Sequence, residues 1–258
     1  MRNIQVYDKP GHRFVLLNES EPGEEDGIRS NQFLIMHGDA GVLQDPDGFG
    51  VMPRVLAEML RYLPPVQVHG IVLSHQHPDI VGGLSTWMEV TQCPINVSAI
   101  WMRFLPHYGF KEMSRFVGVP DQGLPQLAVA PGFNLQILPA HFLHSEGQIN
   151  VYDAASSILF SGDMGAAMLP LDKNYIYVDD FQSHVPFIAW FHRRYMGSNK
   201  AIRIWLQTIS GLEIDMIAPQ HGPIYRGQAV RDLLAWLRDL TCGTDIMQAG
   251  GYFPGEPA

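Results

Sequence analysis

The sequence predicts an α/β fold in which two β-sheets pack face to face and helices cover their outer faces. Short β-type apolar runs separated by turn residues come first along the chain, and strands mixed with helical patterns follow. Of the 258 residues, 46% are hydrophobic and 17% charged, which is enough apolar material for a sizeable core. Because each sheet must bury its apolar faces, we expect one four-layer domain over residues 1–258.

The N-terminal part is predicted to alternate strands and turns before the first helix. Val, Ile, Leu and Phe are concentrated in three runs separated by Gly- and Pro-containing turns, at Asn3–Tyr7, His12–Leu17 and Gln32–His37. Pro53 suits a first helical position, and apolar residues follow at 3.6-residue spacing, which predicts a helix over Pro53–Tyr62. The apolar run Gly70–Ser74 predicts a buried strand.

The C-terminal part is predicted to mix strands with longer helices. Apolar runs predict strands at Phe133–Pro139, Ile149–Tyr152, Ile158–Ser161 and Ile214–Ala218. Helical spacing predicts helices over Pro186–Ile209, with a weak point at Gly197-Ser198-Asn199, and over Gln228–Leu240.

Composition excludes several classes of function. The 26 acidic residues outnumber the 17 basic ones and give a net charge of −9, which argues against nucleic acid as a partner. The acidic run Glu19–Asp26 is expected to be a solvated loop. The apolar runs are too short for a membrane span, and the N-terminus has no export-signal layout. Cys93 and Cys242 form no disulfide framework or cysteine-rich zinc module, so we expect reduced cysteines and a cytoplasmic location.

The segment from Ser74 to Asp79 contains a His-x-His-x-Asp pattern directly after a predicted strand. Alternate residues of extended backbone point the same way, so His75 and His77 can present their imidazoles to one point. Asp79 lies one step further, beyond Pro78. Two imidazoles and a carboxylate suit zinc or non-haem iron. The alternative is a polar surface loop.

Three more ligand-type residues, His144, Asp163 and His221, each follow a predicted strand closely. Any one of these histidines alone could be an ordinary core residue. Together with His75 and His77 they favour a metal site, because such sites need rigid elements that converge on a cleft. Asp163 has two carboxylate oxygens and could bridge two ions.

The order His-x-His-x-Asp, His, Asp, His resembles that of the metallo-β-lactamase fold, an αββα sandwich of two mixed sheets. Leu159–Asp163 and Ala218–Tyr225 are similar to segments of the diiron domain of flavodiiron proteins and, more closely, to the stand-alone oxygen-binding diiron proteins. The similarity extends from about Phe33 to Leu240.

The resemblance implies two metal positions that share one carboxylate. One ion would be held by His75, His77, His144 and Asp163, and the other by Asp79, Asp163 and His221. The ions would be two irons, bridged by Asp163 and an oxo, hydroxo or peroxo ligand. Two zinc ions are the alternative.

Two positions depart from the flavodiiron pattern. His77 stands where a Glu is usual, and Ile80 stands where a further His ligand is usual. Because Ile80 cannot bind a metal, the second ion would keep an open position for water, dioxygen or a substrate oxygen, unless another side chain fills it.

Other residues near these motifs are weaker candidates. Tyr195 resembles a tyrosine near the diiron centre of related proteins, where its phenol could act in catalysis by hydrogen bonding to a bound oxygen species; helix packing is the alternative. His141 is a candidate ligand or hydrogen-bonding partner of one. His184 and His192 either face the cleft or have structural roles.

The resemblance implies a non-haem diiron protein that binds, and in one alternative reduces, dioxygen or NO. The chain has no room for the fused flavodoxin domain of flavodiiron reductases. We therefore expect an oxygen sensor with a signalling partner, or a reductase with a separate electron donor; a homodimer is also open. The rival interpretation is a dizinc hydrolase acting on a thioester, lactone or phosphodiester through a metal-activated water.

Overall fold

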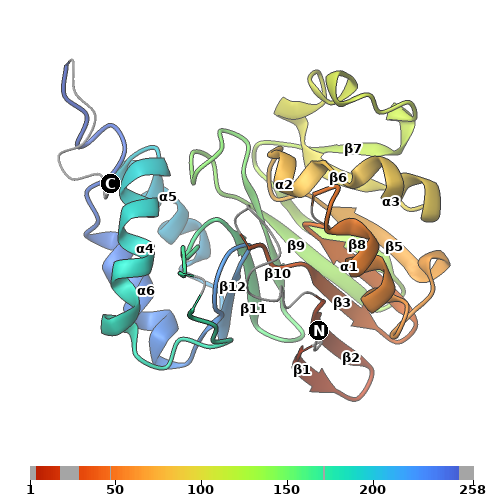
Figure 1. Cartoon of the computed structure of the whole chain (residues 1–258), viewed down its shortest axis with the longest axis horizontal. Coiled ribbons are helices and arrows are strands. Elements are labelled where there is room, and N and C mark those ends of the chain that lie inside the picture. The colour runs from red at the N-terminus through yellow and green to blue at the C-terminus, as the bar shows by residue number, and fades with distance from the viewer. Residues whose placement is uncertain (1–3, 18–28, 47, 171, 250–258) are drawn as a thin grey trace.

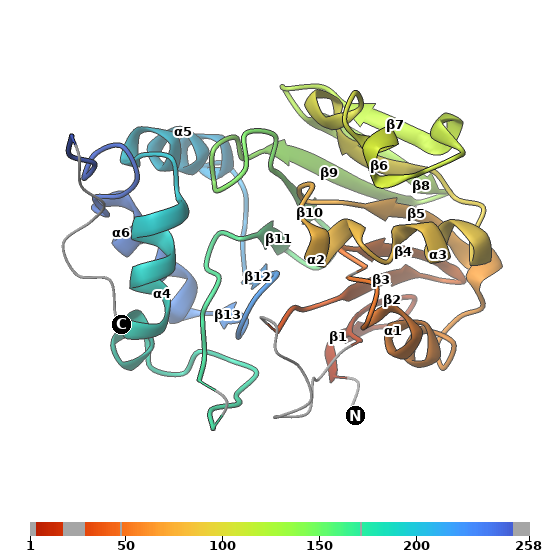
Figure 2. The same ribbon diagram turned by 45° about the horizontal axis from the view of Figure 1, so that its top comes forward.

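The computed structural model describes residues 4–17, 29–46, 48–170 and 172–249. Two β-sheets pack face to face in the middle of the molecule, and a group of helices covers each outer face (Figures 1 and 2). The predicted αββα sandwich of two mixed sheets is confirmed. The acidic run Glu19–Asp26 lies outside the described residues.

The first sheet has seven strands in sequence order. These are β1 (Ile4–Lys9), β2 (His12–Leu16), β3 (Phe33–His37), β4 (Ala40–Gln44), β5 (Val68–Val72), β6 (Ile95–Ser98) and β7 (Phe116–Val119). Strands β1 to β4 pair antiparallel, whereas β4 to β7 pair parallel. Parallel neighbours need crossover connections, and these include α1 (Met52–Met59), α2 (Pro78–Val81) and α3 (Leu84–Val90).

The second sheet has six strands in the order β13-β12-β11-β10-β9-β8. Their bounds are β8 (Leu124–Ala130), β9 (Phe133–Pro139), β10 (Ile149–Asp153), β11 (Ile158–Gly162), β12 (Met216–Pro219) and β13 (Tyr225–Arg226). The pair β11–β12 is parallel, and the other pairs are antiparallel. Helices α4 (Phe181–Tyr195), α5 (Asn199–Ile209) and α6 (Gln228–Arg238) cover its outer face (Figure 1).

Alternating side chains of the strands build separate core layers. Phe14, Phe33 and Phe160 meet between the sheets, with ring centroids 4.8–5.3 Å apart. Val15 and Leu34, their neighbours along the strands, point to the opposite face and pack under the helices of the first sheet. The period of two along a strand therefore supplies the inner and outer layers at once.

The prediction of one long helix over Pro186–Ile209 is wrong in two respects. The helical region begins five residues earlier, and it consists of two helices. The first helix begins at Phe181, because the side chain of Asp180 caps it by accepting hydrogen bonds from the amides of Gln182 and Ser183. The chain then leaves the helical conformation after Tyr195, at the predicted weak point, and the side chain of Ser198 caps α5. None of the helices in the described part of the chain is both long and apolar enough to cross a membrane.

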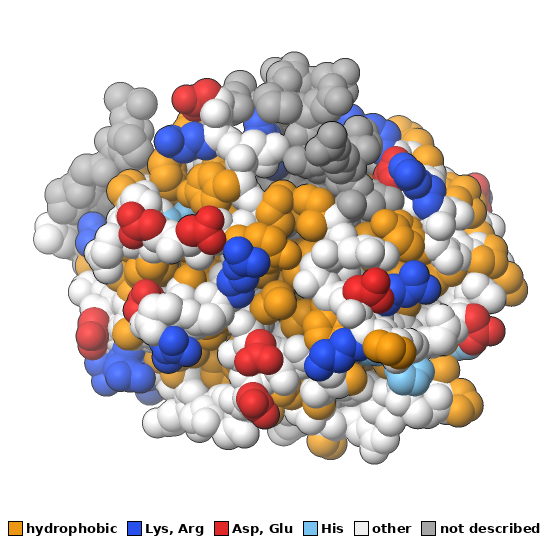
Figure 3. All heavy atoms as spheres, turned by 90° about the horizontal axis from the view of Figure 1, so that it is seen from below, with side chains coloured by type: hydrophobic (Ala, Val, Ile, Leu, Met, Phe, Trp, Pro, Cys, Tyr) orange, Lys and Arg blue, Asp and Glu red, His pale blue; other side chains and the backbone are white. Residues whose placement is uncertain are grey.

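Charged side chains of both signs are mixed on the face shown in Figure 3, around a central area of hydrophobic side chains. Proteins that bind nucleic acid usually gather Lys and Arg into a patch or stripe. The visible part of this face has no such stripe.

Candidate metal centre

The first sheet supplies one half of the candidate metal centre. Strand β5 ends at Val72, and His75 follows it in the connection to α2. His77 is the N-cap residue of α2, and Asp79 lies in the first turn of that helix. Pro78 at the first helical position ends the extended segment and starts the helix, which carries Asp79 to the side of the two histidines.

The second sheet supplies the other half. His144 lies in the connection between β9 and β10, Asp163 comes directly after β11, and His221 follows β12. Strands β11 and β12 are parallel neighbours, so their carboxyl ends lie at the same edge of the sheet. The structure therefore brings all six predicted side chains to one place between the ends of the two sheets.

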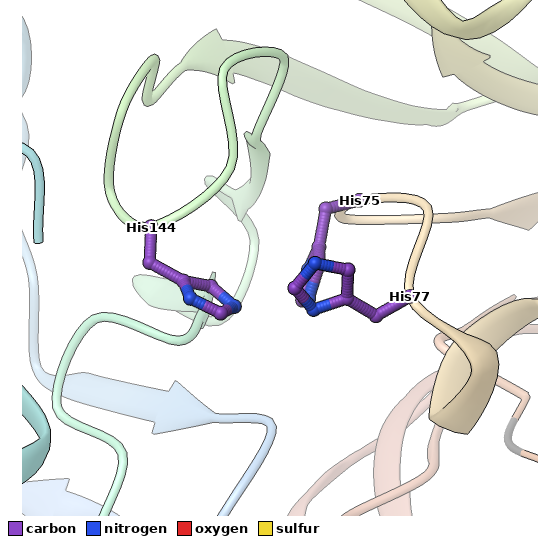
Figure 4. Close-up of side chains that lie close together, drawn as sticks. All are labelled: His75, His77 and His144. Atoms are coloured by element: carbon purple, nitrogen blue, oxygen red, sulfur yellow. The ribbon is translucent and has the colours of Figure 1, made fainter. Parts of the chain in front are cut away.

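Three imidazoles surround one point (Figure 4). Suitable ligand atoms of His75, His77 and His144 all lie within 4.8 Å of one another. His144 reaches in from the β9–β10 connection, opposite the other two, which come from the segment after β5. Three nitrogen donors on separate backbone positions form a group that can hold zinc or iron.

Asp163 faces both halves of the centre. Its Oδ2 lies 2.7 Å from Nε2 of His144 and 3.3 Å from Nε2 of His75, whereas its Oδ1 lies 3.6 Å from Nε2 of His221. The residue is 1% exposed, and Oδ1 has no hydrogen-bond partner among the described residues. A buried carboxylate oxygen without a donor is costly, and a cation beside it would remove that cost. The residues present therefore fit a pair of metal ions that share this carboxylate.

The pKa of Asp163 also suits a carboxylate that is shared by two metal ions. Burial alone would raise its pKa, but the neighbouring His75, His144 and His221 outweigh burial and hold the pKa below its usual range. The carboxylate therefore stays ionised, which is the form that binds a metal.

His221 and Asp79 form the second part of the centre. Nε2 of His221 lies 3.3 Å from Oδ2 of Asp79, while Nδ1 donates to the backbone oxygen of Arg29 at 2.8 Å. Burial would lower the pKa of His221, but the bond to Asp79 and the charge of Asp163 raise it to about 9. Without metal, a protonated His221 thus supplies part of the positive charge that a cation would bring.

Residues next to the six candidate ligands hold them in place through hydrogen bonds. Ser74 Oγ lies 3.0 Å from Nδ1 of His75, and burial is the main reason why the pKa of His75 falls to about 3. The neutral imidazole that results is the metal-binding form. The side chain of Gln220 donates to Oδ2 of Asp79 at 3.1 Å. Asp45 accepts from the amide of Ser74 at 2.6 Å, and burial raises its own pKa to about 7.

The sequence analysis missed Asp45, Ser74 and Gln220. Gln220 is adjacent to His221 in the sequence, and Ser74 is adjacent to His75. Asp45 directly follows a buried strand, as Asp163 does, and this placement was the signal available for it.

A cavity of about 480 Å³ opens over the centre. The histidine and acidic residues among its described lining residues are the predicted six. Apolar side chains complete the wall, including Val51, Met168, Trp190 and Phe191. Ile80 is fully buried in the core of the first sheet, and no other described His, Asp, Glu or Cys lines the cavity in its place. Near Asp79 the wall includes Gly48. The backbone of this glycine lies so close to Asp79 that an added Cβ would be in van der Waals contact with it, 3.7 Å from its Cα.

A family of proteins described as "ODP family beta lactamase" matches residues 28–222. The chain belongs to this family.

This member of the ODP family is similar to solved structures of two kinds of protein, a chemotaxis sensor and flavo di-iron proteins. A structure described as the peroxy diiron species of the chemotaxis sensor ODP is 37% identical, with a TM-score of 0.85 over 95% of this chain and 98% of that one. The apo state of the chemotaxis sensor ODP from T. denticola is 38% identical, with a TM-score of 0.84 over 95% of this chain and 97% of that one. A mutant of a flavo di-iron protein from Thermotoga maritima is 20% identical, with a TM-score of 0.75 over 92% of this chain and 60% of that one, and shares the fold.

A curated relative is longer than this chain. The putative diflavin flavoprotein A 4 from Synechocystis sp. (strain ATCC 27184 / PCC 6803 / Kazusa) is 28% identical over 214 residues. The match covers 81% of this chain but spans about a third (34%) of that protein.

The three secondary histidines do not reach the centre of this ODP-family chain. Both nitrogens of His141 lie 2.8 Å from backbone oxygens, those of Glu146 and Asp121, so this side chain braces the loop that carries His144. His184 bonds to the hydroxyls of Tyr175 and Tyr225, at 2.7 and 2.9 Å.

His192 lies behind the loop that follows Asp163. Its Nε2 accepts from the amide of Gly165 at 2.9 Å, and its Nδ1 donates to the backbone oxygen of Ile188 at 2.8 Å. The histidine is therefore a buried support for that loop.

Tyr195 lies at the rim of the cavity. Its ring contacts that of His144 edge-on, with centroids 5.4 Å apart, and stacks on Phe191. The residue is 45% exposed. The catalytic role of Tyr195 stays a prediction.

Proposed function

We propose that this chain is a non-haem diiron protein that binds dioxygen as an oxygen sensor. The observation that carries the proposal is Asp163, whose two carboxylate oxygens face different halves of one histidine-rich centre. The proposal is supported by the 37% identity, over nearly the whole of both chains, to a protein described as a chemotaxis sensor with a peroxy diiron species.

We assign His75, His77, His144 and Asp163 to one ion and Asp79, Asp163 and His221 to the other. Bound ferrous ions would supply the electrons that hold dioxygen, which redox-inert zinc cannot do. The second ion would have fewer protein ligands because the side chain of Ile80, which is buried in the core, has no atom that binds a metal, and this leaves room for an external oxygen ligand.

Side chains at the cavity wall would tune the environment of that ligand. Met168, Trp190 and Phe191 present apolar surface and limit the access of water. Tyr195 lines the cavity with its ring against that of His144, and we infer that its hydroxyl donates a hydrogen bond into the cavity.

The sensor role is favoured over that of a reductase by sequence identity, which is 37% to the chemotaxis sensor and 20% to the flavo di-iron protein. The chain spans 98% of the matched sensor structure, but 60% of the flavo di-iron protein and 34% of the diflavin flavoprotein. A reductase role would need a separate electron donor. NO as a ligand, a signalling partner and a homodimer remain proposals. We also infer that the chain works as one domain, because both sheets contribute to the centre, and that it is cytoplasmic, since both of its cysteines are free and buried.

The second candidate function is a dizinc hydrolase. It is favoured by the all-nitrogen group formed by His75, His77 and His144, a ligand set that zinc accepts readily. Against it, the second ion would lack the ligand lost at Ile80.

Metal analysis together with optical spectroscopy tests the proposed function. Anaerobically reduced, iron-loaded protein should be nearly colourless and develop an absorption band when oxygen is admitted. His144→Ala and His221→Ala should abolish the band, while the control His69→Ala, at an exposed position of β5, should keep it. Colourless protein that holds two zinc ions and hydrolyses a thioester or lactone would refute the proposal.

A further inference from the structure

A short segment of the N-terminal half binds the loop that carries His221. The segment consists of residues 29–31 and lies directly before β3, in the first sheet. The loop, which we call the His221 loop, consists of residues 219–222 at the end of β12, in the second sheet. The two are far apart in the sequence, yet the backbone oxygen of Arg29 accepts from Nδ1 of His221 at 2.8 Å. The segment therefore contacts a candidate metal ligand directly.

Asn31 makes the other contacts between this segment and the His221 loop. Its backbone amide donates to the backbone oxygen of Gln220 at 2.5 Å. Its side-chain nitrogen Nδ2 donates to the backbone oxygens of Pro219, at 2.9 Å, and Gly222, at 2.7 Å. Both partners are acceptors, so the orientation of the amide group is determined, and each of its two N–H groups has an oxygen to bond. One side chain thus spans the loop from the residue before Gln220 to the residue after His221.

The second sheet fixes the same loop from its own side. The amide of Gln220 donates to the backbone oxygen of Gly162 at 2.7 Å, and the backbone oxygen of His221 accepts from the amide of Ala167 at 3.1 Å. Gly222 has φ of +82°, which turns the chain directly after His221. These bonds tie the loop to its own sheet, whereas Asn31 ties it to the sheet that supplies Asp79.

The second metal position is the one that depends on this loop. Its assigned ligands are Asp79, Asp163 and His221, and the side chain of Asp79 is 38% exposed whereas that of His221 is 6% exposed. The first position has four assigned ligands, and these have supports of their own. Ser74 bonds to His75, and His141 braces the loop that carries His144. A change at Asn31 should therefore act on the second position and spare the first.

We propose that Asn31 is a positioning residue for the second metal position, and that its two side-chain hydrogen bonds decide whether the centre binds two ions or one. This inference rests on the proposed function and names the residue on which its second ion depends. Metal ligands must be held within about 0.5 Å of their working positions by the groups around them. Without the bonds from Asn31, the His221 loop would lose both of the contacts that bracket His221.

Hydrogen–deuterium exchange of the metal-free protein tests whether Asn31 fixes the loop. Asn31→Leu has a similar size and removes both side-chain donors. Peptides that cover residues 219–222 should exchange about tenfold faster in this variant, because the loop opens more often. Peptides that cover residues 141–147 should not change. Asn134→Leu, at an exposed position of β9, is the matched control and should exchange like the wild type. Asn31→Ala removes the same donors with less bulk and replaces Asn31→Leu if that variant does not fold.

Titration with Co²⁺ tests the effect on metal binding. Cobalt accepts the same imidazole and carboxylate ligands, and its visible absorption reports binding. The wild type should bind two ions, and Asn31→Leu should weaken the second binding step about 10–100-fold while the first stays within about threefold. Trp205→Phe, which removes a buried hydrogen bond to Asn150 away from the centre, separates positioning from a general loss of stability and should bind both ions like the wild type.

The outcomes separate this inference from the proposed function. An unchanged second binding step, equal losses at both steps, or unchanged exchange of residues 219–222 in Asn31→Leu would overturn the role of Asn31. A wild-type protein that binds one Co²⁺ would instead refute the proposed pair of ions, and the exchange experiment would still decide whether Asn31 fixes the loop.

Discussion

Replacing His192 by Gln should weaken the acid dependence of stability in the metal-free protein. His192 is fully buried behind the loop that follows Asp163, where it accepts from the amide of Gly165 and donates to the backbone oxygen of Ile188. Burial is the main cause that lowers its pKa from 6.5 to about 4, so the folded protein holds the ring neutral. Gln keeps an acceptor and a donor at this position but cannot take up a proton.

The sign and size of the effect follow from linkage between protonation and folding. Between pH 6.5 and 4 the unfolded chain protonates this histidine while the folded protein does not. The stabilisation is therefore complete above pH 6.5 and is lost as the pH falls toward 4. A difference of about 2.5 pKa units corresponds to a loss of about 3 kcal/mol over this range, as an order of magnitude.

Urea unfolding with a chelator present, at about pH 7 and about pH 4, measures the change in free energy of unfolding. The wild type should lose about 3 kcal/mol more than His192→Gln between these conditions. The control His69→Gln, at an exposed position of β5, should behave like the wild type. Equal acid-induced losses in His192→Gln and the wild type would show that the buried histidine is not held neutral.

Three further predictions concern the metal centre and the packing of the fold. Asp163→Asn should lower the iron content measured by metal analysis from two ions to about one or fewer per chain, because one neutral amide replaces the carboxylate shared by both sites. Trp205→Phe should lower the free energy of unfolding in urea by about 1–2 kcal/mol, since the buried indole N–H donates to Oδ1 of Asn150 at 2.7 Å. Gly222→Ala should cost about 2–4 kcal/mol in the same assay, because the residue has φ of +82° and the new Cβ would lie 2.7 Å from Cβ of Ala167. Unchanged iron content, or stabilities within about 0.5 kcal/mol of the wild type, would contradict the respective predictions.

The layers of the fold could be predicted because its central strands have strong local patterns. Strand β2 directs Phe14 between the sheets and Val15 toward the helices, and this alternation is visible in the sequence. Strands β4, β6, β7, β8 and β13 were not predicted. Strands β7 and β8 lie at the ends of their sheets and are partly exposed, with little apolar periodicity. Strands β4, β6 and β13 have only two to five residues each and directly follow segments rich in Gly or Pro, so their apolar runs are too short to stand out. Helix α2 has four residues, which is too short for a helical period to show.

The candidate site likewise has one part that could be predicted from the sequence and one part that could not. Ligand-type side chains directly after strands are visible in the sequence, because position on a strand determines where they lie. The groups that hydrogen bond to these ligand-type side chains are not visible in the sequence in this way. Gln220 reaches Asp79 across 141 positions, and His221 bonds to a backbone oxygen of Arg29 across 192. A backbone oxygen has no sequence signature, and the packing of two sheets decides which distant groups meet.

The origin of the ligands also constrains how the centre can transmit a signal. His75, His77 and Asp79 belong to the first sheet, and His144, Asp163 and His221 to the second, so bound metal would join the two halves of the sandwich. The halves are already fixed by the aromatic layer between the sheets and, without metal, by the pairing of His221 with Asp79 and of His75 with Asp163. Binding into such a preformed site leaves little scope for the sheets to move against each other.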